Sequence, residues 1–132
     1  MTASNQPLEL ILARNLTASL AIPSFLVDTA GMLVFYNAAA GELLGKRFEE
    51  IGRRSLAEWS ADHAPFEQDG REIPTEELPF TIAVRESRPV HRRFQVRADG
   101  GPPMEIESSA VPLAGASGCQ GAIVVFWPVS GA

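Results

Sequence analysis

The strongest constraint on the fold is the C-terminal third of the chain, whose pattern is that of three strands joined by short turns. In residues 90–98, apolar side chains such as Phe94 and Val96 alternate with polar ones, as in a strand with one buried face. Two further strands are expected at 104–113 and 119–129, and glycine-containing turns separate all three. Strands joined by such short turns pair as antiparallel hairpins, so the sequence predicts an antiparallel sheet.

The N-terminal half predicts a second hairpin and a set of short helices. Apolar and aromatic runs at 24–28 and 32–36 flank a turn that contains Gly31. Helices are expected at 38–44 with Asn37 as the N-cap, at 48–51, just after Ser55, and at 75–87. Hairpins at both ends with helices between them indicate an α+β fold rather than a doubly wound parallel sheet.

Length and composition exclude several classes of protein. A chain of 132 residues with 45% apolar and 20% charged residues forms one domain and can bury its own core. The single cysteine, Cys119, excludes an intramolecular disulfide and a multi-cysteine zinc site, so a cytoplasmic location is expected. The net charge of −5, with no Lys/Arg block among aromatic residues, argues against nucleic acid as a partner. No apolar stretch reaches the roughly 18 residues of a membrane span.

An amphipathic helix is expected ahead of the first strand. Its apolar side chains fall at helical spacing on one stripe, at Leu8, Ile11, Leu12, Leu16 and Leu20. Pro23 ends the helix. The sequence is therefore divided into an N-terminal helical segment, residues 1–21, and a main domain, residues 22–130.

Four stretches of the main domain resemble the PAS family in their order and spacing. They are Phe25–Ala40, Leu43–Lys46, Asp69–Pro74 with Glu76–Pro79, and Arg97–Gly100 with Gly121–Phe126. The first stretch is similar to the family's opening hairpin and the Asn-initiated helix after it, and the second to a helix that ends in Gly. The third is similar to the turn before the family's longest helix, and the fourth to its last hairpins. The resemblance covers about residues 22–130 and implies a five-stranded antiparallel sheet with short helices across one face.

The resemblance also implies a pocket between the sheet and the helices. In some PAS domains this pocket holds haem, flavin or a metabolite, whereas other members serve as dimerisation modules. By alternation and by the family's geometry, the candidate pocket residues of the last two strands are Ile106, Ser108, Ala110, Ala122, Val124 and Phe126. The aromatic residues Phe35, Trp59 and Phe94 are further candidates. Apolar walls with one hydroxyl suit a small, largely apolar ligand, and a packed core without free space is the alternative.

The other face of the last expected strand carries Ile123, Val125 and Trp127. Three large apolar side chains in a row expose a patch unless another element covers them. The stripe of the N-terminal helix is the candidate cover, either within one chain or from a second copy, and the resemblance implies a homodimer formed through this helix. The candidate interface is Leu8, Ile11, Leu12, Leu16, Leu20, Ile123, Val125 and Trp127.

The polar residues predict no cofactor, metal or catalytic centre. Haem in this family hangs from a histidine on the helices beside the pocket, whereas His63 is expected in a loop and His91 on the polar face of a strand. A photoactive flavin–thiol site requires a cysteine on the central helices, and none is expected there. Trp59 could nevertheless stack on a flavin ring. Glu105 and Glu107 share an outward strand face, and no acid and base converge. We therefore assign no cofactor and leave haem and flavin open as alternatives, and we expect no enzyme activity.

The sequence thus predicts a cytoplasmic, homodimeric PAS-like sensory module that binds a small apolar ligand or a protein partner. No output domain is expected in this chain, and Pro128-Val129-Ser130 stands where the family often has Asp-x-Thr. Two alternatives stay open. One is an enzyme for small molecules with an apolar pocket on a cone-shaped α+β fold, and the other is a ligand-free dimerisation module.

Overall fold

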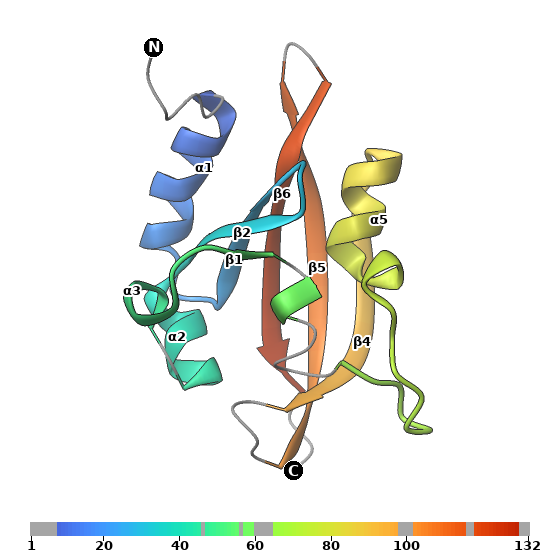
Figure 1. Ribbon diagram of the computed structural model, residues 1–132. Coiled ribbons are helices and arrows are strands. Elements are labelled where there is room, and N and C mark those ends of the chain that lie inside the picture. Colours follow the sequence, from blue (N-terminus) through green and yellow to red (C-terminus); the bar gives the residue numbers. More distant parts are fainter. Residues whose placement is uncertain are drawn as a thin grey trace.

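One curved antiparallel sheet of six strands organises the protein, in the order β3-β2-β1-β6-β5-β4 (Figure 1). The computed structural model describes residues 8–45, 47–55, 57–59, 65–97, 102–115 and 118–129. The strands are β1 (Ser24–Asp28), β2 (Met32–Tyr36), β3 (Arg54–Ser55), β4 (Val90–Arg97), β5 (Pro103–Gly115) and β6 (Gly118–Pro128). Five of them are the expected strands, and the α+β fold is confirmed. The sixth, β3, is a two-residue strand on β2 that the sequence analysis did not expect, and the helical turn expected after Ser55 is present at 57–59.

The helices are short. They are α1 (Leu8–Ser19), α2 (Ala38–Leu44), α3 (Phe48–Ile51), the 3-10 turn η1 (Thr75–Glu77) and α5 (Pro79–Glu86), with a further helical turn at 57–59. The single helix expected at 75–87 is wrong in one respect, because Leu78 divides it into η1 and α5. Leu78 has an extended backbone with ψ of 149°, since the ring of the following proline disfavours the helical conformation.

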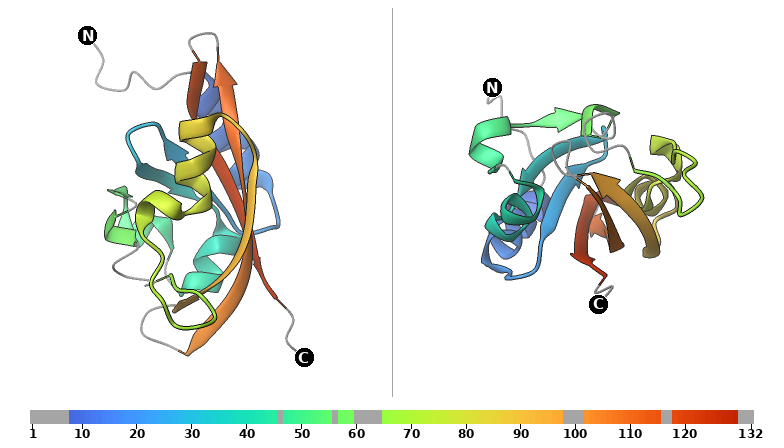
Figure 2. Two further views of the ribbon diagram at one scale, coloured as in Figure 1. Left: turned by 90° about the vertical axis from the view of Figure 1, so that its right-hand side faces the viewer. Right: turned by 90° about the horizontal axis from the view of Figure 1, so that it is seen from below.

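The sheet carries helices on both faces. Figures 1 and 2 show α1 and α5 on opposite sides of β5 and β6. Side chains from α2 and α5 join the larger apolar cluster, whose buried aromatic residues are Phe25, Tyr36, Trp59, Phe80, Phe94 and Phe126. A smaller cluster on the other face contains Leu10 and Ala13 of α1 with Leu26 and Val34 of the sheet. We call these two sides the inner face and the outer face.

Asn37 connects the two faces. Its side-chain oxygen accepts hydrogen bonds from the backbone N–H groups of Ser24 (3.1 Å) and Ala40 (3.0 Å), and the second of these caps α2. Its amide nitrogen donates to the carbonyl groups of Thr17 (3.1 Å) and Ile22 (2.8 Å), at the end of α1 and in the segment that follows. One buried side chain therefore fixes the end of α1, the start of β1 and the start of α2 together.

Candidate functional site

The inner face retains only a small cavity. Its volume is about 30 Å³, which leaves room for one or two water molecules. Of the expected pocket residues, those that line it are Trp59, Phe94, Ser108, Val124 and Phe126. These five residues lie together between the sheet and the helices, where the space is nearly filled.

Aromatic rings fill this space. The ring centroid of Phe25 lies 4.6 Å from that of Phe126 and 5.6 Å from that of Trp59. Both separations are typical of favourable aromatic pairs. The sequence analysis did not name Phe25 as a pocket residue. Phe25 and Val27 lie two residues apart on β1 and therefore share a face, and this pattern could have placed both on the inner face.

Three other expected pocket residues lie in the core without lining the cavity. Ile106 and Ala110 of β5 belong to the inner cluster, and Ala122 of β6 is fully buried. Their small or branched side chains pack against neighbours, so they supply core contacts and no free volume.

The prediction for Phe35 is wrong. Its ring packs with the outer cluster, and the guanidinium of Arg14 lies 4.7 Å from its centroid. The cause is an irregularity in the pairing of β1 with β2: Leu26 pairs with Phe35, but the next residue, Val27, pairs with Leu33. The extra residue in β2 shifts the alternation by one position and turns Phe35 to the other face.

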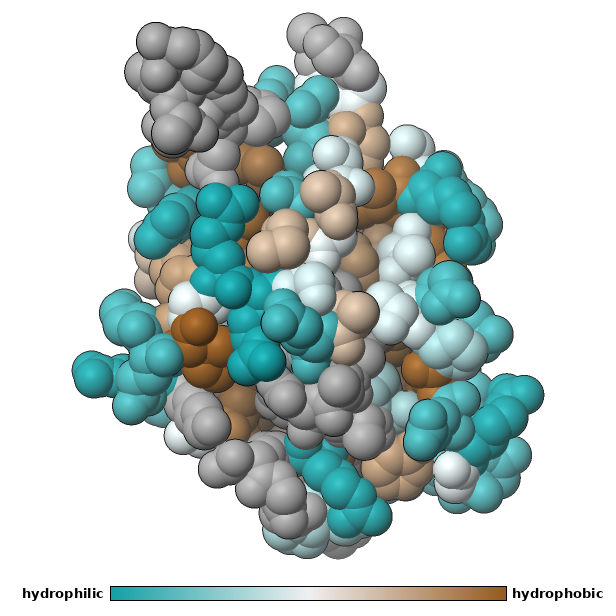
Figure 3. Space-filling view, in the orientation of Figure 1, coloured by the Kyte–Doolittle hydropathy of each residue, from teal (hydrophilic) through white to brown (hydrophobic). Residues whose placement is uncertain are grey.

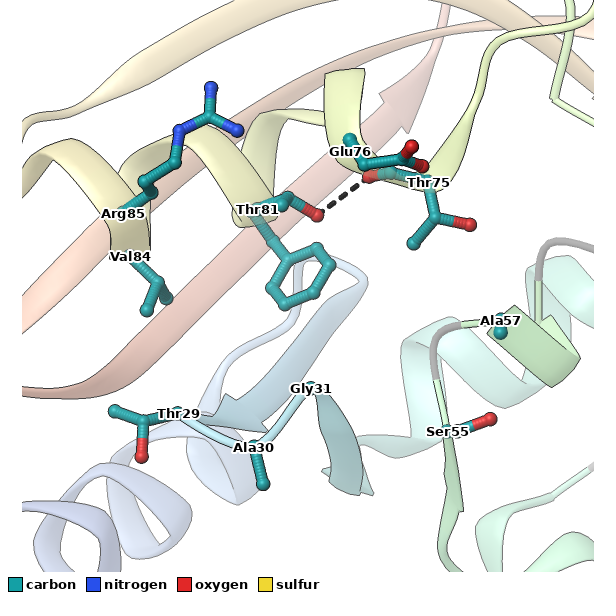
Figure 4. Close-up of a pocket in the computed structure, with 11 residues that line it drawn as sticks. Thr29, Ala30, Gly31, Ser55, Ala57, Thr75, Glu76, Thr81, Val84 and Arg85 are labelled. Atoms are coloured by element: carbon teal, nitrogen blue, oxygen red, sulfur yellow. Dashed lines mark hydrogen bonds between the residues drawn. The ribbon is translucent and has the colours of Figure 1, made fainter.

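A larger groove lies beside α5 and was missed by the sequence analysis. Its volume is about 530 Å³. The β1–β2 turn, β3 with residue 57, η1 and α5 surround it (Figure 4). It is lined by Thr29, Ala30, Gly31, Ser55, Ala57, Thr75, Glu76, Phe80, Thr81, Val84 and Arg85. These residues come from four separate stretches of the sequence, so no local pattern marks them.

Two hydrogen-bonded turns hold the walls of this groove. On one side, the Asp28 carboxylate accepts the backbone N–H groups of Ala30 and Met32, each at 3.0 Å. On the other side, the Thr81 hydroxyl donates to the carbonyl oxygen of Thr75 at 2.7 Å and ties α5 to η1 (Figure 4). The walls are therefore braced independently of anything that occupies the groove.

The outer face of the molecule exposes the apolar stripe of α1. The helix packs on the sheet through Leu10, Ala13 and Thr17. The side chains opposite to them are 46 to 64% exposed, namely Leu8, Ile11, Leu12 and Leu16. The expectation that this stripe covers the sheet within one chain is wrong, because α1 uses its other side for that contact.

The apolar side chains of β6 continue this exposed surface only in part. Ile123 packs against the outer cluster, whereas Val125 and Trp127 are half-buried. Beside α1, a second groove of about 340 Å³ runs between Leu12 and Leu16 on one side and Leu113 of β5 on the other. We call Leu8, Ile11, Leu12, Leu16 and this neighbouring groove the leucine surface.

The remaining outer face, on β4 and β5, is charged. His91 Nε2 lies 2.8 Å from a carboxylate oxygen of Glu107, and Arg93 lies 3.4 Å from the other oxygen. The hydrogen bond from His91 lowers the pKa of Glu107 below its usual value. The His91 ring also lies 6.0 Å from that of Trp127. The charges compensate one another at the surface, as in a solvated sheet face.

The inner cavity offers no acid or base for catalysis. None of the described residues that line it is acidic, basic or a histidine. Cys119 Sγ, at the start of β6, lies 3.3 Å from the carbonyl oxygen of Gly121, away from the cavity. His63 lies outside the described residues.

The fold and the sequence identify the family. Residues 17–132 match the model of the PAS fold, so the chain belongs to the PAS family. Domains of this family are generally sensory and signalling modules rather than enzymes. No curated protein matches the chain.

Three solved structures illustrate the likeness. The PAS domain of Bordetella pertussis BvgS has a TM-score of 0.62 at 14% identity, over 92% of this chain and 86% of that one. A PAS domain from Colwellia psychrerythraea has a TM-score of 0.65 at 17% identity, over 91% and 96% of the two chains. Vibrio cholerae VqmA has a TM-score of 0.59 at 16% identity, over 91% of this chain and 51% of its own. At these identities the likeness concerns the fold.

In the part of the chain that the structure describes, no helix has the length and apolar character needed to cross a membrane.

Proposed function

We propose that this PAS domain is a homodimeric signalling module in which the leucine surface forms the contact between two copies. The observation that carries the proposal is the orientation of α1. Four large apolar side chains of this helix point away from its own sheet and are about half exposed or more. Exposing such a stripe is costly in water unless a partner covers it.

A second copy is the partner that suits this surface best. An interface between identical subunits brings the same patch of both chains together, so an apolar stripe is complementary to itself. Leucine side chains from two helices interdigitate readily, and the groove beside α1 offers space for those of the partner. The structurally similar VqmA is also a dimer.

The packed inner face favours protein contact over a resident ligand as the basis of signalling. A cavity of about 30 Å³ is far below the several hundred Å³ typical of a small-molecule site. A signal that reaches the dimer contact would then pass through α1, which Asn37 attaches to both β1 and α2.

The experiment compares two variants that each add one carboxylate to an exposed helical position. Leu12→Glu lies in the leucine surface, and Ala38→Glu lies on α2. Size-exclusion chromatography with light scattering should give the mass of a dimer for the wild type and for Ala38→Glu, and that of a monomer for Leu12→Glu. A monomeric wild type, or a Leu12→Glu variant that remains a dimer with a native circular dichroism spectrum, contradicts the proposal.

A further inference from the structure

The helix α1 packs on the sheet through the side that carries its smaller residues. Ala13 and Thr17 make this contact together with Leu10, whereas Leu12 and Leu16 point away from it. Figure 3 shows apolar and hydrophilic residues side by side on the left of the molecule, where Figure 1 places α1. In this position the helix buries less apolar surface than its sequence offers.

The contact between α1 and the sheet also buries a polar group without a partner. The Thr17 side chain has 0% exposure, and its hydroxyl has no hydrogen-bond partner in the part of the chain that the structure describes. A buried hydroxyl that makes no hydrogen bond destabilises the state that buries it. The observed position of α1 is therefore opposed by Thr17 as well as by the exposed leucine side chains.

The groove of the leucine surface lies directly beside this contact. It has a volume of about 340 Å³ and separates α1 from Leu113 of β5 and Ile123 of β6. Ala13 lines the groove and also belongs to the outer cluster, so the free space begins where the helix meets the sheet. The helix can therefore roll about its own axis toward the groove without first leaving the sheet.

A roll of α1 by one residue position, about 100°, exchanges its two sides. Leu12 then takes the direction that Ala13 has in the structure, and Leu16 takes that of Thr17. The Thr17 hydroxyl turns toward solvent, where water can bond it. Ile11 stays exposed, because it takes the present direction of Leu12.

The attachment of α1 to Asn37 permits such a roll. Within the helix, Asn37 bonds only a backbone group, the carbonyl of Thr17. The last turn of a helix has several carbonyl groups without partners in the helix, so a neighbouring one can accept the same bond after the roll. The carbonyl groups of Leu20 and Ile22, which Asn37 also bonds, lie beyond the end of the helix.

Two residues near the start of α1 favour the observed position. The Leu10 side chain lies over Gly121 of β6, where a Cβ atom would come within 3.1 Å of it. The roll replaces Leu10 by Glu9, and burial of a carboxylate is unfavourable. This cost offsets part of the gain from Leu12 and Leu16, so both positions are accessible.

We propose that α1 alternates between these two positions and thereby regulates the leucine surface. In the observed position a second copy can bind this surface, whereas in the rolled position Leu12 and Leu16 lie against the sheet of their own chain. Because the dimer selects the observed position, a signal that shifts the balance also shifts dimerisation. The regulatory role rests on the proposed function, but the roll belongs to a single chain and can be measured without the dimer.

Two variants that add a carboxylate to the leucine surface separate the positions. Ile11→Glu and Leu12→Glu should both prevent dimerisation, but only Leu12→Glu also blocks the side that meets the sheet after the roll. Nuclear Overhauser spectra of the methyl-labelled full chain report the contacts of Val34 in the outer cluster. In Ile11→Glu the contact of Leu10 with Val34 should weaken and one of Leu12 with Val34 should appear. In Leu12→Glu the contact of Leu10 with Val34 should keep its full intensity.

Thr17→Val tests the same balance from the opposite side. Valine has nearly the shape of threonine and buries no hydroxyl, so it favours the observed position. Sedimentation equilibrium should therefore give a dissociation constant of the dimer about tenfold lower than that of the wild type. Thr29→Val, the same change at an exposed position of the β1–β2 turn, is the control and should leave the constant unchanged.

Either of two results would overturn the proposal. One is an undiminished contact of Leu10 with Val34 in Ile11→Glu and none from Leu12, and the other is an unchanged dissociation constant in Thr17→Val. A native circular dichroism spectrum shows that each variant is folded. If the wild type is monomeric at every concentration, the proposed dimer fails, and the contact of Leu12 with Val34 in that wild type still decides whether α1 rolls.

Discussion

The two faces of the sheet use apolar residues in different ways. On the inner face, aromatic rings from β1, β4, β6 and α5 meet and leave about 30 Å³ of free space. On the outer face, α1 contacts the sheet through Leu10, Ala13 and Thr17 and directs larger side chains outward. The inner face therefore stabilises the single chain, whereas the outer face leaves apolar surface exposed, which we propose serves association. Mutations on the two faces should consequently change different measured quantities.

The largest expected effect is on the inner face. Phe126→Ala removes a buried ring that packs on Phe25, so the free energy of unfolding should fall by about 3–5 kcal/mol. Urea denaturation followed by circular dichroism measures this loss. Val111→Ala, at an exposed position of the outer side, is the control and should change it by less than about 1 kcal/mol. A loss below about 1 kcal/mol for Phe126→Ala would mean that the inner face is not closely packed.

The connection between the faces should give the next largest effect. Asn37→Ala removes the cap of α2, the side-chain acceptor of the buried Ser24 N–H, and one of the donors to each of the carbonyl groups of Thr17 and Ile22. The expected loss of unfolding free energy is about 3 kcal/mol. Asn15→Ala, at an exposed position of α1, is the matched control. Equal stability of the two variants in thermal and urea denaturation would show that Asn37 does not connect the faces.

A change on the leucine surface should alter association and leave the single chain stable. Dissociation and unfolding are coupled in a dimer, so the wild-type melting temperature should rise with protein concentration. Leu16→Glu should remove that dependence while changing the stability of the monomer by only about 0.5 kcal/mol. Differential scanning calorimetry over a hundredfold range of concentration measures both. A concentration dependence that persists in Leu16→Glu would place the contact elsewhere.

The smallest effect is expected in the charged patch of β4 and β5. Because His91 lowers the pKa of Glu107 in the folded protein, the unfolded chain binds a proton there more readily. The stabilisation is present above the ordinary glutamate pKa and is lost as the pH falls through the lowered value. Glu107→Gln should therefore lose less stability than the wild type on acidification below about pH 4.5. Melting temperatures between neutral and acidic pH measure this, with Glu72→Gln as the control, and parallel curves would contradict it.

Most of the fold was predictable because it follows from local patterns. Alternation marks β4, and the stop at Pro23 marks the end of the first helical segment. Asn37 and Gly45 bracket α2, and Gly45 has the φ of +88° that a glycine C-cap readily adopts. The two-residue strand β3 was not predictable, since its pairing with β2 is a tertiary contact with no period of its own.

The site was predictable only where the sheet is regular. The alternation of β5 and β6 correctly placed Ser108 and Phe126 on the inner face. The inner position expected for Phe35 of β2 is wrong, because a one-residue irregularity in the pairing of β2 with β1 interrupts the alternation there. The free volume also was not predictable, since it depends on how Phe25 and Phe80 from distant elements fill the space. The same holds for α1, where the sequence shows a stripe but not which side meets the sheet.

The most direct test of the contrast between the two faces is a nuclear Overhauser measurement on a mixture of isotope-labelled and unlabelled protein. Such an experiment detects methyl groups of one copy that lie against another copy. We predict intermolecular contacts from the methyl groups of Leu12 and Leu16 and none from those of Val27 and Leu33 on the inner face. Intermolecular contacts that arise only from residues outside the leucine surface, or none at all at millimolar concentration, would contradict this account.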